Sequence, residues 1–278
     1  MNSETTPAWL ALLALQCGVV SRRQALCHGL NLDAIEYRLR SGRWRAAHRG
    51  VYATFNGPLS REAVLWAAVL RAGPEAALSH QTAAELLGLT DQRSHVIHLT
   101  VPLGRHPEPI RGAVVHRSGR ISAATHPTQL PPRTRVEETT IDLTQSAATF
   151  DDAYAWLCRA IGGRLTIAAR LRAALEARPK VRWRTGLTIA LAEADSGVHS
   201  LLESRYVNNV EVPHGLPAAT RQARTARTPL SRYVDNLYDE AGLVVELDGR
   251  VAHGIAERRA DVRRDNAHAA VGHRHAAL

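Results

Sequence analysis

Arg232-Tyr-Val-Asp-Asn-Leu-Tyr-Asp-Glu-Ala-Gly-Leu-Val-Val-Glu-Leu-Asp-Gly249 has the pattern of a β-hairpin that brings acidic residues together. Apolar side chains flank a turn at Asp239-Glu-Ala-Gly242, a composition that favours reversal of the chain. If this four-residue loop closes symmetrically, Asp235 lies directly opposite Glu246, and Asp248 shares the face of Glu246. The stretch therefore predicts a sheet that carries a cluster of carboxylates.

Carboxylates held this close repel each other unless a cation neutralises them. Oxygen ligands suit Mg²⁺ or Mn²⁺, which keep coordination sites for phosphate and water. The hairpin therefore predicts a Mg²⁺ (or Mn²⁺) cofactor and phosphodiester chemistry. The alternative is that each acid faces solvent and pairs with one of the many arginines.

The composition favours a nucleic-acid partner. The 278 residues are enough for two or three domains, and 35 Lys+Arg against 26 Asp+Glu give a net charge of +9. Most of the basic residues are arginines, whose planar guanidinium suits phosphate, although an arginine-rich genome would give the same bias. The apolar run Trp9–Gln16 is too short to span a bilayer, so we expect a cytoplasmic protein with no membrane partner.

Residues 1–57 have the element order of a winged helix-turn-helix domain. Helix starts are predicted at Pro7, at Ser21 and at Asn31 or Asp33, and strand character follows over 44–53. Basic residues concentrate on the expected recognition helix, the wing and the preceding helix, and they are the predicted DNA contacts: Arg22, Arg23, Arg38, Arg40, Arg43, Arg45 and Arg49. The alternative is a small helical domain with a solvated basic face.

The rest of the chain completes an α+β protein of three expected domains. Residues 58–195 mix helical and strand patterns, and residues 196–278 form a separate unit. In this last unit a helix with Glu203, strands with acids and a charged helix with Arg264 follow one another. This is the α-β-β-β-α order of the restriction-endonuclease-like core.

Two resemblances can be named from these motifs. Ser200-Leu-Leu-Glu203, Glu246-Leu-Asp-Gly249 with His253, and Arg263-Arg-Asp-Asn266 resemble the actinobacterial DUF559 family, a Vsr-like branch of the PD-(D/E)XK nuclease superfamily. Val19-Val-Ser-Arg-Arg-Gln-Ala-Leu26 resembles the N-terminal winged helix of AbiEi-type antitoxins. Such antitoxins belong to type IV toxin–antitoxin systems and repress their own promoters.

The resemblance implies a set of site residues and partners. Asp235 and Glu246 would be direct metal ligands, and Glu203 a metal ligand or a residue that positions water. Arg264 would hold the scissile phosphate or pair with Asp261. The implied catalytic group is Glu203, Asp235, Glu246, Asp248 and His253, with His253 as general base or acid. DNA, a cognate toxin and a second copy of the chain are the implied partners.

Two departures from the family pattern bear on activity. Asp248 stands where the superfamily signature has lysine, which leaves His253 to activate water. The run Gly272-His-Arg-His-Ala-Ala-Leu278 stops where the family continues with a further strand, so we expect a truncated core without its parallel strand. Three interpretations of the function are possible from the sequence: an active nuclease, a repressor or antitoxin with an inactive nuclease fold, and a decayed nuclease.

Overall fold

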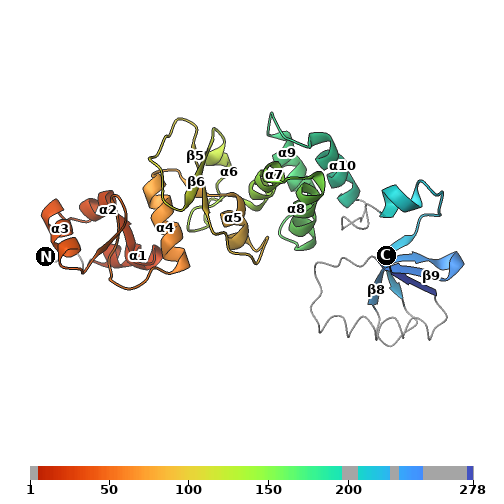
Figure 1. The fold of residues 1–278 in the computed structure, drawn as a ribbon, viewed down its shortest axis with the longest axis horizontal. Helices are drawn as coiled ribbons and strands as arrows, with labels where there is room; N and C mark the ends of the chain where they lie inside the picture. Colours follow the sequence, from red (N-terminus) through yellow and green to blue (C-terminus); the bar gives the residue numbers. More distant parts are fainter. Residues whose placement is uncertain (1–5, 196–205, 226–231, 247–273, 278) are drawn as a thin grey trace. The chain divides into compact units, whose positions relative to one another are not determined.

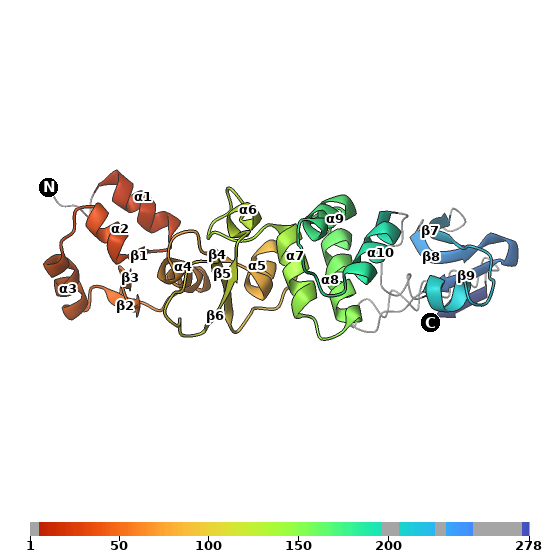
Figure 2. The same cartoon turned by 90° about the horizontal axis from the view of Figure 1, so that it is seen from above.

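The protein has a mixed α+β fold, as expected (Figures 1 and 2). The computed structural model describes residues 6–195, 206–225, 232–246 and 274–277. The chain divides into two compact units, residues 1–147 with 173–180, and residues 148–172 with 181–278. Within the described residues no helix is both long and apolar enough to cross a membrane.

The first unit begins with three helices and a small antiparallel sheet of strand order β1-β3-β2. The elements are α1 (Pro7–Leu15), β1 (Val19–Ser21), α2 (Arg22–Cys27), α3 (Leu32–Arg40), β2 (Arg45–His48) and β3 (Val51–Ala53). Trp9 and Trp44 stack with ring centroids 6.2 Å apart, and Ile35 of α3 packs in the same core. These large buried side chains fix α3 against the sheet.

A second sheet follows, of strand order β4-β5-β6, in which β5 and β6 run parallel. Its elements and neighbours are α4 (Arg61–Ala72), β4 (Ala77–Leu78), α5 (His80–Leu87), β5 (Ile97–Pro102), β6 (Ala113–Ser118), α6 (Ile121–Ala124) and α7 (Val136–Ser146). Strand β5 lies in the middle and buries Leu99 and Val101 completely, which explains its apolar sequence.

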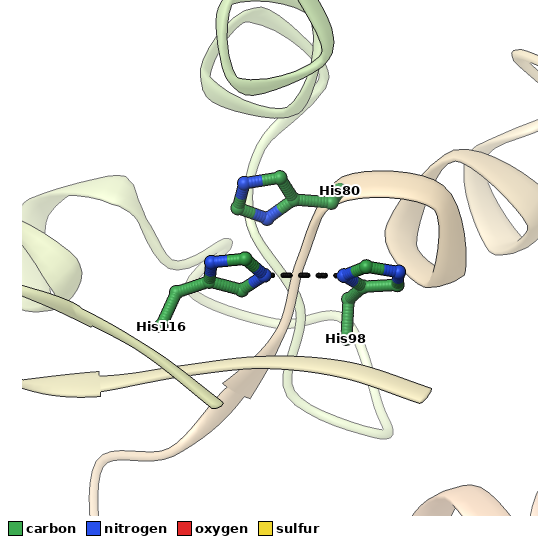
Figure 3. A group of neighbouring side chains, drawn as sticks. All are labelled: His80, His98 and His116. Atoms are coloured by element: carbon green, nitrogen blue, oxygen red, sulfur yellow. Dashed lines mark hydrogen bonds between the residues drawn. The ribbon is translucent and has the colours of Figure 1, made fainter. Parts of the chain in front are cut away.

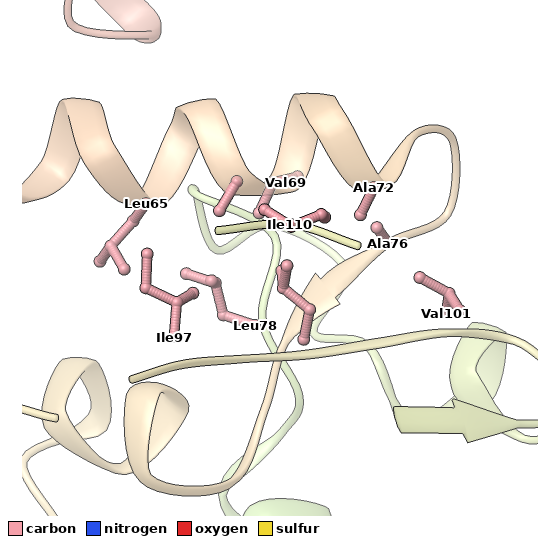
Figure 4. Packing of buried hydrophobic residues seen from close by; sticks show 10 residues of the cluster. Leu65, Val69, Ala72, Ala76, Leu78, Ile97, Val101 and Ile110 are labelled. Atoms are coloured by element: carbon pink, nitrogen blue, oxygen red, sulfur yellow. The ribbon is translucent and has the colours of Figure 1, made fainter. Parts of the chain in front are cut away.

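Helix α4 contributes to two hydrophobic cores. Ala63, Trp66 and Ala67 pack with Val19 and Val51 of the first sheet. Leu65, Ala68, Val69 and Ala72, on the opposite side of a 3.6-residue helix, pack with the second sheet (Figure 4). The helix that follows the expected boundary at residue 57 is therefore shared by both sheets.

The second unit combines helices with a four-stranded sheet of order β10-β9-β8-β7. Its elements are α8 (Phe150–Gly162), α9 (Ala168–Glu176, which crosses the division at residue 172), α10 (Arg184–Asp195), η2 (Val207–Glu211), β7 (Thr220–Thr225), β8 (Arg232–Tyr238), η3 (Asp239–Ala241), β9 (Leu243–Glu246) and β10 (Arg274–Ala277). Residues Phe150 to Glu176 form two helices, because Gly162 and Gly163 end the first.

The expectation of a core without its parallel strand is wrong. Residues Arg274–Ala277 form β10, which pairs parallel to β9 with Arg274 opposite Leu243 and Ala277 opposite Glu246. The sequence Arg-His-Ala-Ala has neither the β-branched residues nor the alternation that predicts a strand. The strand forms because its backbone finds hydrogen-bond partners in β9, and not because its own sequence favours a strand.

Candidate functional site

The predicted DNA-contacting arginines surround α3 and the β2–β3 hairpin. The Asn31 side chain caps α3 by accepting from Ala34 N at 2.8 Å, and Ile35 anchors the buried face. Arg40 in the last turn of α3 and Arg43 in the following turn are exposed, and Arg45 in β2 is half-buried. The helix and hairpin therefore present basic side chains along one continuous segment.

Four of these arginines make internal contacts. Arg22 Nε donates to the Tyr52 hydroxyl at 3.0 Å, and Arg38 Nη1 donates to the Ala34 carbonyl at 2.8 Å. Arg43 lies over the Tyr37 ring at 5.8 Å, and Arg49 pairs with Glu108 at 3.2 Å. Arg23, Arg40 and Arg45 have no ion pair with another described residue. Basic residues in the last turn also complement the helix dipole, which is a structural reason for Arg38 and Arg40.

The C-terminal hairpin has the register expected from its sequence. Tyr238 pairs with Leu243, Leu237 with Val244, and Asn236 with Val245, across the turn formed by η3 and Gly242. Continuing this register by one residue sets Asp235, which is half-exposed, opposite Glu246. The remaining predicted site residues lie outside the described part of the chain: Glu203, Asp248, His253 and Arg264.

A buried polar cluster missed by the sequence analysis lies beside β7. The Glu211 carboxylate accepts from Ala219 N and from Arg221 Nη2, each at 2.6 Å. The Tyr206 and Tyr238 hydroxyls lie 3.0 Å apart, and burial raises the pKa of Tyr238. Because Glu211 is paired on both oxygens, the cluster holds η2 on the sheet and offers no open site.

Three histidines of the first unit come together (Figure 3). His80 begins α5, His98 lies in β5 and His116 lies in β6. His98 Nδ1 is 3.1 Å from His116 Nε2, and the His80 ring stacks on the His116 ring with centroids 3.8 Å apart. One ring nitrogen from each histidine lies within 4.8 Å of the other two.

Burial keeps these imidazoles neutral. It lowers the pKa of His80 to about 3, with further contributions from His116, His98 and Arg178. Burial also lowers the pKa values of His98 and His116. At neutral pH each ring therefore carries one proton and one free lone pair.

An ion-pair network lies beside the histidines, in the wall of a cavity of about 390 Å³. Glu138 of α7 accepts from Arg120 at 2.7 Å and from Arg178 at 2.6 Å, and Arg178 also pairs with Asp142 at 2.7 Å. The positive charges of these two arginines therefore balance the negative charges of the two carboxylates. Arg117 and Lys180 add positive charge to the same wall.

Sequence reasoning expected strands within residues 58–195 but did not find the cluster. The three histidines are separated by 18 residues or more, and the available signal was a Ser-His pair at a helix start and one histidine in each of two strands. The parallel pairing of β5 and β6 and the position of α5 bring them together.

Comparisons with known proteins leave the family open. No protein-family model and no curated protein matches the chain. A similar solved structure is the crystal structure of the RV2827C protein from Mycobacterium tuberculosis. It is 18% identical, with a TM-score of 0.45 over 66% of this chain and 78% of that chain.

Proposed function

We propose that this chain binds DNA through α3 and the β2–β3 hairpin. The observation that carries the proposal is the exposure of Arg40, the last residue of α3, and of Arg43 in the turn that follows. Asn31 caps the start of this helix, and Ile35 anchors its buried face. Arginine side chains on a rigid helix end contact phosphates and base edges without a large ordering cost. Arg45 continues the basic surface into the hairpin.

The element order supports a winged helix-turn-helix as the finer description. Three helices are interleaved with a small antiparallel sheet, and β2 and β3 form the hairpin expected of a wing. In such domains the third helix enters the major groove and the wing contacts the flanking backbone. The proposed surface matches these two roles, and it agrees with the resemblance to AbiEi-type antitoxins.

The test compares two pairs of arginines of equal charge. Arg40→Ala with Arg43→Ala removes two proposed contacts, while Arg93→Ala with Arg111→Ala removes two exposed arginines of the middle region. Binding is measured on a random duplex and on DNA upstream of the gene, over a range of salt concentrations. We expect only the first pair to lose affinity and to reduce the salt slope by about 2. Equal losses in both pairs would show that net charge alone attracts DNA.

A second function, metal-dependent DNA cleavage, is favoured by the C-terminal sheet. The antiparallel β7-β8-β9 strands and the parallel β10 agree with the core of restriction-endonuclease-like nucleases, and the register sets Asp235 opposite Glu246. Carboxylates are the donor type that Mg²⁺ binds, so the chemistry of these two residues fits the ion. Bound Mg²⁺ would polarise the phosphate and lower the pKa of water. Asp235 and Glu246 would hold and orient it.

The cleavage test uses supercoiled plasmid with Mg²⁺, Mn²⁺ or EDTA. Asp235→Asn is compared with Asp239→Asn, which removes an exposed acid from the adjoining turn. We expect nicking that requires the metal and is lost only in Asp235→Asn. Retained DNA binding without cleavage by the unaltered protein would instead favour a repressor or antitoxin, with a toxin as its partner.

A further inference from the structure

The three histidines of α5, β5 and β6 form a site that the proposed DNA functions do not use. Within the described residues, His80, His98 and His116 are the group whose ring nitrogens converge closely enough for one ion. They come from two neighbouring strands of one sheet and from the first residue of a helix, rather than from a tail or a loop. Figure 3 shows the His80 ring above the gap between the other two rings.

We infer that His80, His98 and His116 bind one Zn²⁺ ion. Zinc takes imidazole nitrogens at about 2.0–2.1 Å, which sets two ligands of a tetrahedral site about 3.3 Å apart. His98 Nδ1 and His116 Nε2 are already 3.1 Å apart. His80 offers a ring nitrogen within 4.8 Å of those of the other two histidines, and this nitrogen must move closer to reach the same ion.

A hydrogen bond orients the His80 ring. Histidine ligands in zinc sites are oriented in the same way, by a hydrogen bond from the ring nitrogen that does not bind the metal. His80 Nδ1 lies 3.0 Å from the buried Ser79 hydroxyl, which accepts from Thr100 Oγ1 at 2.8 Å. In the tautomer that donates from Nδ1, His80 Nε2 keeps its lone pair for a metal. Ser79 N also donates to the His98 carbonyl at 3.0 Å, which ties the start of α5 to β5.

The backbone at His80 is unusual in a way that suits a site. Its φ of +49° lies in the left-handed region, which a residue other than glycine rarely adopts. Such strain persists only where the surroundings hold it, and it concentrates at ligand sites. Here it aims the imidazole at His116, with which the ring stacks.

The electrostatic surroundings permit a cation. Arg178 faces His80 and would oppose it, but Glu138 and Asp142 both pair with Arg178. His80 and His116 also line the cavity, so a fourth coordination position is open to water or to an anion near Arg117 and Lys180.

The experiment measures zinc affinity of the full chain after removal of metal with EDTA. Because the sequence has other histidines near its C-terminus, His268, His273 and His275 are first changed to Gln together. On this background we expect one Zn²⁺ per chain in competition with a chromophoric chelator. His98→Gln and His116→Gln should each weaken binding by at least about 100-fold, and Ser79→Ala by roughly 10–100-fold.

His95→Gln is the matched control, because His95 is exposed and lies three residues before His98. Circular dichroism without zinc checks that each variant folds. Co²⁺ in place of zinc gives a readout on the protein with all three histidines, which should show the intense visible absorption of a tetrahedral site. Zinc affinity unchanged in both His98→Gln and His116→Gln, no stoichiometric binding, or a weak octahedral Co²⁺ spectrum would overturn the inference. Stabilisation by inorganic phosphate alone would make the cavity an anion site.

Discussion

Arginines near the N-terminus and arginines of the middle region differ in their surroundings. Arg40 and Arg43 are exposed, and Arg40 has no ion pair with another described residue. Arg178, whose side chain is 16% exposed, pairs with Glu138 and Asp142, and Arg120 pairs with Glu138 as well. The same residue type is therefore exposed in one region and stabilises internal structure in the other. The net charge of +9 does not show which arginines are exposed and which are paired inside the protein.

The largest effect is expected from Arg178→Ala. This change leaves Glu138 and Asp142 buried beside each other without their shared cation, which should lower the free energy of unfolding by about 3–5 kcal/mol. Urea unfolding of the full chain measures it. Arg93→Ala, at an exposed position, should change stability by less than about 0.5 kcal/mol.

A second variant distinguishes lost pairing from lost packing at Arg178. Arg178→Met combined with Glu138→Gln and Asp142→Asn removes these three charges together and keeps similar volumes. It leaves the charge of Arg120 without Glu138, but the Arg120 side chain is 31% exposed and can be solvated. We expect it to recover much of the stability lost in Arg178→Ala, because uncompensated charge is the main cost. If the triple change is as unstable as the single one, packing of the arginine stem is the dominant contribution.

The C-terminal hairpin could be predicted because its information is local. A four-residue turn that ends in Gly242, at a φ of +58°, fixes the register of both strands, so Asp235 opposite Glu246 follows from counting. Strand β10 could not be predicted in this way. Its four residues depend on β9 for pairing, and their own sequence carries little strand preference.

The histidine cluster and the Arg178 network depend on contacts between distant residues. Arg178 lies 40 residues from Glu138, and nothing in its sequence context, next to Pro179 and Lys180, indicates that it is buried. Its burial follows from its ion pairs with α7. Periodicity gives the faces of helices and strands, but it does not say which faces meet. Sequence thus predicted the elements around both sites better than the sites themselves.

A smaller effect is expected at the start of α3. Asn31→Ala removes the acceptor for Ala34 N and should lower stability by about 1 kcal/mol. The uncapped N-terminal end of α3 should fray and so destabilise this short helix. Because α3 carries Arg40 at its other end, DNA affinity should fall with the stability of the helix. Asn31→Asp keeps the cap, so it should retain stability in urea unfolding and α3 helicity. A loss of DNA binding with full stability in Asn31→Ala would mean that Asn31 contacts DNA itself.

The smallest effect is expected at Glu108, which forms an internal ion pair with Arg49, one of the arginines proposed to contact DNA. This exposed acid pairs with Arg49 of the β2–β3 turn at 3.2 Å and with Arg71 at 2.5 Å. Exposed pairs contribute little, so Glu108→Gln should lower stability by less than about 1 kcal/mol. Freed from the acid, Arg49 should bind phosphate better, and DNA affinity should rise a few-fold at low salt. A fall in affinity would show that Glu108 positions Arg49 for DNA, and so the ion pair would belong to the binding surface.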